Sequence, residues 1–186
     1  MKSELLLEPT ALAQWKQLIQ QAEERCHQAL DEDVESYLIF TLMRFTQSPQ
    51  LASRVLAPEF LNSAQLTGAA RHNQLRDVGD ECLLLSGLFP QVAQRRLVQP
   101  SYYVQLGQTA YDHLSQLMRE ALANLYQQLA SCFVSMMDVL QNLRDEPALM
   151  PLQAYDLWQQ TGSQAARHQL SENAGFAALD PGKYRH

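Results

Sequence analysis

The clearest pattern that could hold a metal lies near the N-terminus, where Glu24 and His27 stand three residues apart. On a helix this spacing places a carboxylate and an imidazole one turn apart, as in the di-iron sites of helical bundles. Such a site also needs a second Glu-x-x-His pair and two further acids. The sequence has no second pair, and a single histidine does not predict a haem ligand. We therefore expect no metal and no other cofactor.

Two further places invite a catalytic interpretation. Asp112 and His113 are neighbours in the sequence, but adjacent residues of a helix point about 100° apart and do not form a dyad. His113 shares a predicted apolar face with Leu106 and Leu117, where it is either a buried core histidine or a base with a perturbed pKa. Cys82 has no histidine nearby and begins an apolar run, which favours a buried, unreactive thiol. We assign no catalytic residue.

The block GDECLLLSGLFP, residues 79–90, joins two acids and two glycines to an apolar run. It is too short to cross a bilayer, so we expect it to be buried inside the protein. Asp80 and Gly87 then lie on one face of a helix. A buried acid is costly unless it is paired, and we predict that Arg95 or Arg96 neutralises Asp80.

A later block, SYYVQLGQTAY, places Tyr103, Gly107 and Tyr111 on one face of a second helix. The glycine makes a notch between the two tyrosines and predicts a close approach to Gly87. Two interpretations stay open. The notch is either a tightly packed helix crossing, or a small pocket lined by the tyrosines with Asp80 and an arginine at its polar end.

The composition predicts an all-α protein. The sequence has 31 leucines and 21 alanines but only two isoleucines and eight valines, and no segment alternates with a period of two. We predict one helical bundle over residues 1–186, with a buried central helix at about 75–89 and one long helix at about 101–143. Residues 162–186 are predicted to form a weakly anchored C-terminal segment. The acids of residues 31–35 are interpreted as a helix cap.

The charge and the cysteine count restrict the partners and the compartment. The formal net charge is −6 and the basic residues are scattered, which disfavours nucleic acid and anionic membranes as partners. No apolar run approaches the roughly 20 residues of a transmembrane helix. Three widely spaced cysteines make neither a disulfide framework nor a metal knuckle. We expect a reduced, cytoplasmic protein.

Taken together, the two blocks and the Arg95–Arg96 pair resemble a family of uncharacterised bacterial all-helical proteins. The resemblance covers about residues 34–118. It implies a bacterial cytoplasmic protein and supplies no catalytic residue.

Two functional hypotheses follow from the sequence. The first is a non-catalytic interaction or regulatory protein, either a homodimer or bound to an unknown protein partner, that uses glutamine-rich helical faces or its C-terminal tail. The second is a small-ligand-binding protein or enzyme with an apolar pocket between helices. His113, Tyr103, Tyr111 and Asp80 would line that pocket, with His113 as the acid or base.

Overall fold

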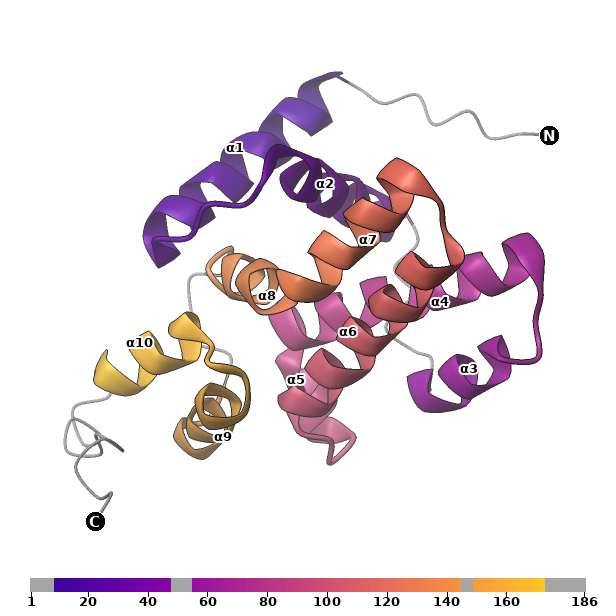
Figure 1. Ribbon diagram of the computed structural model, residues 1–186. Coiled ribbons are helices and arrows are strands. Elements are labelled where there is room, and N and C mark those ends of the chain that lie inside the picture. The colour runs from indigo at the N-terminus through magenta and orange to yellow at the C-terminus, as the bar shows by residue number, and fades with distance from the viewer. Residues whose placement is uncertain (1–8, 48–54, 145–148, 173–186) are drawn as a thin grey trace, which may run out of the picture.

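The computed structural model describes residues 9–47, 55–144 and 149–172, and these residues form helices and connecting segments without any strand. The predicted all-α class is therefore confirmed (Figure 1). The helices within these ranges are α1 (Pro9–Cys26), α2 (Glu32–Gln47), α3 (Leu56–Ser63), α4 (Gly68–Gly87), α5 (Pro90–Arg95), α6 (Pro100–Leu117), α7 (Glu120–Ser131), α8 (Phe133–Gln141), α9 (Pro151–Thr161) and α10 (Gln164–Glu172). None of them is long and apolar enough to span a bilayer.

Helix α4 is the centre of the bundle, as the sequence predicts. Every residue from Val78 to Gly87 is buried, because α4 packs against α3, α5, α6 and α8 on its different sides. The last part of α4, from Cys82 to Gly87, is apolar apart from Ser86, as is typical of a helical segment inside a protein. The buried part of α4 also contains Asp80 and Glu81, so this helix brings carboxyl groups into the core.

The single long helix predicted at 101–143 is wrong, since this segment forms α6, α7 and α8. Met118 and Arg119 have extended backbones, and Glu120 has a positive φ of 49°. This short connection turns the chain so that α7 packs back along α6 (Figure 1). Cys132 then separates α7 from α8. The residues around these breaks favour a helix and include no proline or glycine, so the sequence does not mark the breaks. Tertiary packing here overrides the local helix propensity.

The buried face of α6 also differs from the predicted one. Leu106, His113 and Leu117, which we expected to point inward, are only half-buried. The fully covered side chains include Tyr103 and Tyr111. Helix α6 is packed between α4 and α7, so two of its sides are covered, and a single apolar stripe does not describe it.

Two helix pairs flank this centre. Helix α1 packs on α2 and α8, while α9 and α10 pack on each other and on α6 and α8 (Figure 1). The backbone N–H of Asp33 donates to Asp31 Oδ1 at 3.1 Å at the start of α2, which supports the capping interpretation of the acidic residues. In the predicted weakly anchored segment, α10 buries Ala166 and Leu170. Residues 173–186 lie outside the described residues.

Candidate functional site

Asp80 lies in a polar cluster whose partners differ from the arginines that the sequence predicts. Asp80 is 1% exposed, and its Oδ1 accepts hydrogen bonds from the hydroxyls of Tyr37 and Tyr111, both at 2.7 Å. Its Oδ2 forms an ion pair with Arg44. We name these four residues the Asp80 cluster. Arg44 also reaches Asp77 at 3.3 Å, so the cluster extends from the core to the half-buried surface.

The ionisable groups of the Asp80 cluster are strongly affected by burial. Burial raises the pKa of Asp80, although Arg44 and the two tyrosine hydroxyls act in the opposite direction. Burial and the nearby Asp80 carboxylate raise the pKa values of Tyr37 and Tyr111 well above 10. Both phenols therefore stay protonated and donate hydrogen bonds at physiological pH.

The helix crossing beside this cluster is tightly packed. A Cβ atom added at Gly79 would lie 2.4 Å from Cε1 of Tyr111, and one at Gly107 would lie 2.4 Å from Cε2 of Phe133. Both glycines thus let large rings fill the space around α4 and α6. The predicted contact between Gly87 and Gly107 is wrong, because Gly87 faces Leu140 of α8. Of the two interpretations of this region, the geometry favours the packed crossing.

The remaining predicted residues lie outside the Asp80 cluster. Arg95 is exposed and Arg96 is half-buried on or just after α5, and neither is among the partners of Asp80. Tyr103 is buried with its ring 5.5 Å from that of Tyr102. His113 is half-buried with its ring 5.4 Å from that of Phe60. Of the six predicted residues, Asp80 and Tyr111 are joined by a hydrogen bond.

The two partners that the sequence analysis missed are Tyr37 and Arg44 of α2. A signal for them exists in the sequence. They stand seven residues apart, which places them on one helical face, and they interrupt the apolar run SYLIFTLMRF. A polar pair on one face of an otherwise apolar helix indicates that something polar lies opposite it.

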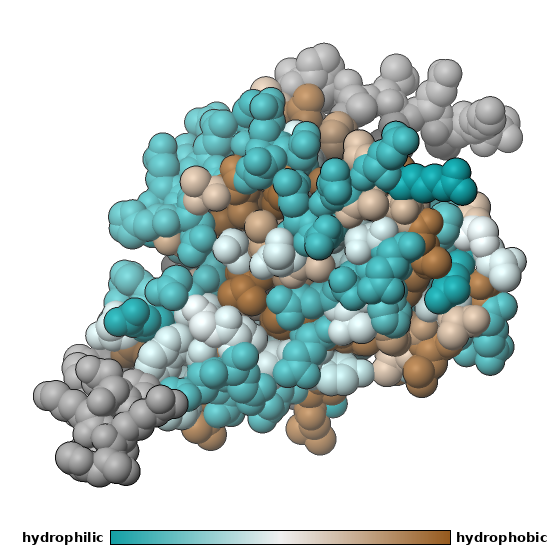
Figure 2. Space-filling model, viewed as in Figure 1, coloured by the Kyte–Doolittle hydropathy of each residue, from teal (hydrophilic) through white to brown (hydrophobic). Residues whose placement is uncertain are grey.

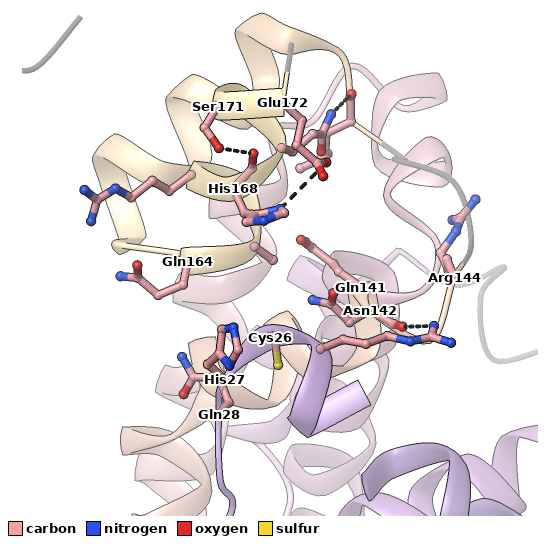
Figure 3. Close-up of a pocket in the computed structure, with 15 residues that line it drawn as sticks. Cys26, His27, Gln28, Gln141, Asn142, Arg144, Gln164, His168, Ser171 and Glu172 are labelled. Atoms are coloured by element: carbon pink, nitrogen blue, oxygen red, sulfur yellow. Dashed lines mark hydrogen bonds and ion pairs between the residues drawn. The ribbon is translucent and has the colours of Figure 1, made fainter. Parts of the chain in front are cut away.

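A cleft of about 760 Å³ lies away from this cluster, between the end of α1, the end of α8 and α10 (Figure 3). Polar residues cover most of the visible face around the ends of α1 and α10 (Figure 2). The lining residues come from three distant segments: Arg25, Cys26, His27, Gln28, Gln141, Asn142, Arg144, Leu149, Gln164, Ala165, Arg167, His168, Gln169, Ser171 and Glu172.

Cations dominate the cleft. Among the described residues that line it, three arginines stand against one acid, Glu172, which gives these residues a formal net charge of +2 with both histidines neutral. The chain as a whole carries −6. We name this site the basic cleft. It is a local positive region on an acidic protein.

The wall formed by α1 depends on how that helix ends. His27 has a positive φ of 52°. The N–H of Gln28 donates to the carbonyl of Glu23 at 3.0 Å, and the N–H of His27 donates to that of Glu24 at 3.4 Å. This is a Schellman ending, in which glycine usually occupies the left-handed position. The side chain of His27 consequently stands at the mouth of the cleft (Figure 3).

The wall formed by α10 is fixed by a buried acid of α8. Asp138 Oδ1 accepts the hydroxyl of Ser163 at 2.5 Å, and Oδ2 accepts the backbone N–H groups of Gln164 and Ala165 at 2.8 and 3.4 Å. The carboxylate thus caps the N-terminus of α10 from another helix. Burial raises the pKa of Asp138, while these hydrogen bonds oppose the shift.

The arginines of the cleft differ in their partners. Arg144 donates to the carbonyl of Leu88 at 2.7 Å and so caps the end of α4. Arg25 donates one hydrogen bond to the carbonyl of Asn142 at 3.2 Å. Within the part of the chain that the structure describes, no hydrogen bond or ion pair engages the guanidinium of Arg167, which is exposed.

The titratable side chains of the cleft include Cys26, His168 and Glu172. Burial raises the pKa of Cys26, so this thiol stays protonated and is a poor nucleophile. His168 Nδ1 lies 3.7 Å from Glu172 Oε2 along the exposed side of α10 (Figure 3). Among the described residues, no group of three or more histidines, cysteines and acids could hold a metal ion.

Scans against family profiles, curated proteins and solved structures find no match to this chain.

Proposed function

We propose that this is a non-catalytic interaction protein of the bacterial cytoplasm, and that a protein partner binds in the basic cleft. The observation that carries this proposal is the contrast between the filled helix crossing and the open cleft. The crossing holds large rings against glycines. The cleft presents two exposed arginines, Arg25 and Arg167, on two of its walls.

The state of the ionisable groups favours binding over catalysis. The thiols of Cys26 and Cys82 have raised pKa values because of burial. Asp80 and Asp138 are buried with hydrogen bonds to both carboxylate oxygens. A general acid or nucleophile must reach its substrate, and these groups are held by the fold.

The lining of the cleft favours a protein partner over a small apolar ligand. Pockets for small molecules are lined mostly by apolar and aromatic side chains. Twelve of the fifteen described lining residues carry polar side chains, and none is phenylalanine, tyrosine or tryptophan. Such a surface suits a polar segment that brings its own hydrogen-bonding groups.

Photo-crosslinking tests this proposal. A benzophenone side chain placed at Gln28 or Gln164, inside the cleft, is expected to trap the same protein in cells that make this chain naturally. Gln116, exposed on α6 outside the cleft, is the matched control position and should trap nothing. The Arg25→Glu change should remove the adduct at both cleft positions.

Two outcomes would contradict the proposal. One is equal trapping from Gln116 and from the cleft positions, which would place the partner elsewhere. The other is a stoichiometric organic ligand in the native mass spectrum of the purified protein, which would favour the alternative of a ligand-binding protein or enzyme.

A further inference from the structure

We propose that the segment bound in the basic cleft is a short acidic stretch of the partner, rich in aspartate and glutamate. This inference rests on the proposed function, since it names the chemistry of the partner at that same site. It follows from the arginines of the cleft, from its carboxamide lining and from the acidic surface around it.

The arginines provide the recognition of carboxylates. A guanidinium has five N–H donors in a planar fork that matches a carboxylate with two parallel hydrogen bonds. Arg25 uses one nitrogen for the carbonyl of Asn142 and is exposed. Arg167 stands on the opposite element, α10. Two such groups on separate walls fit a segment with at least two acidic side chains.

The carboxamides fit the main chain of an extended segment. One third of the lining consists of glutamine and asparagine: Gln28, Gln141, Asn142, Gln164 and Gln169. The side-chain nitrogens of Gln141, Asn142, Gln164 and Gln169 donate hydrogen bonds to backbone carbonyls of the protein itself, but a carboxamide nitrogen has a second N–H and its oxygen accepts, as in a peptide group. A lining of this kind suits a peptide backbone that runs across the cleft between the arginines.

The range of the electrostatic field favours a short segment over a long polyanion. At physiological ionic strength the field of exposed charges is screened over about 8 Å. Beyond the cleft the protein is acidic overall. A nucleic acid longer than the cleft would meet a protein of net negative charge, whereas a few acidic residues stay within the basic region.

The test uses the full chain and a fluorescein-labelled hexaglutamate peptide, with hexaglutamine and oligothymidylate as comparison probes. Fluorescence anisotropy is expected to show saturable binding of hexaglutamate alone. The Arg25→Glu and Arg167→Glu variants should each weaken binding by about tenfold, because a reversed charge replaces attraction with repulsion. Arg119→Glu, an exposed arginine outside the cleft, changes the net charge equally and should alter affinity by less than about twofold.

Three results would overturn the inference. Tighter binding of oligothymidylate would indicate a nucleic-acid site, equal binding of hexaglutamine would remove the role of charge, and equal losses for the three arginine variants would indicate non-specific attraction. Circular dichroism of each variant establishes that it is folded. If hexaglutamate does not bind while Gln28 and Gln164 still trap one protein, the acidic segment is wrong but the proposed function stands. If both experiments fail, both proposals fall.

Discussion

The Asp80 cluster and the basic cleft both gather charged side chains from helices far apart in the sequence, but they use them differently. In the cluster, Asp80 has partners on both carboxylate oxygens, and the surrounding rings fill the space. In the cleft, Arg25 and Arg167 lie at the surface of a cavity. The first arrangement fixes how α2, α4 and α6 pack, and the second leaves charges exposed at the surface.

This difference shows why the polar residues that stand out in a sequence need not mark its binding site. Buried polar groups are satisfied in folded proteins because leaving them unpaired is costly. Exposed ion pairs, in contrast, contribute little to stability. We therefore expect substitutions in the Asp80 cluster to change the free energy of unfolding, and substitutions in the cleft to change binding.

The largest effect is expected for Asp80→Ala. It leaves Arg44 without its buried partner and removes the acceptor of Tyr37 and Tyr111, so the free energy of unfolding should fall by about 3–5 kcal/mol. Urea titration measures this loss. Asp112→Ala, an exposed acid of α6, is the control and should stay within about 0.5 kcal/mol. Similar losses for the two variants would remove the distinction between the cluster and the surface.

A smaller loss is expected for Gly79→Ala. The new Cβ would overlap the ring of Tyr111, and overpacking of this kind typically costs about 1–3 kcal/mol. The loss should shrink in a Tyr111→Leu background, where the overlapping ring atoms Cε1 and Cζ are absent. A double-mutant cycle from urea denaturation measures the coupling. Additive effects would show that the crossing is looser than the structure indicates.

The raised pKa of Asp80 predicts a pH dependence of stability. Between the ordinary pKa of an aspartate and its raised value in the fold, the native state binds more protons than the unfolded state. The free energy of unfolding therefore falls as the pH rises through this window. Compared with Asp80→Asn, which does not titrate, the wild type should lose stability between pH 4 and the raised pKa. A relative gain in stability over that range would mean that Arg44 and the two tyrosines lower the pKa of Asp80 by more than burial raises it.

The smallest effect, and one of opposite sign, is expected in the cleft. His27→Gly should raise the free energy of unfolding by about 0.5–1 kcal/mol, because glycine adopts a positive φ without steric cost. Gly162→Ala makes the reverse change at another left-handed position, where φ is 74° and the added Cβ has no neighbour within 4 Å, and it should destabilise. Thermal denaturation compares the two. A loss of stability in His27→Gly would mean that the imidazole supports the fold.

The sequence predicts the buried central helix and the need for a partner at Asp80, because both follow from local composition and from the cost of burying a charge. It does not predict which arginine pairs with Asp80. Arg95 and Arg96 are closer along the chain, but Arg44 is brought to Asp80 by the packing of α2 near α4. The break after Leu117 is hidden in the same way, since no proline or glycine marks it.

The basic cleft could not be predicted from the sequence. Its described lining residues come from 25–28, from 141–144 with Leu149, and from 164–172, and none of these segments carries a run of basic residues. They form a positive region only because Arg25 ties α1 to the end of α8 and Asp138 caps α10. These contacts join segments more than 20 residues apart, and no local pattern in the sequence marks them.

The most direct test of the central claim is a nitrogen–proton NMR titration of the labelled protein with hexaglutamate. We predict that the amide shifts change at residues 25–28, 141–144 and 164–172, while those of Gly79, Asp80 and Tyr111 stay constant. Shift changes centred on α4 and α6, or no changes at saturating peptide, would contradict the claim that the basic cleft is the binding site.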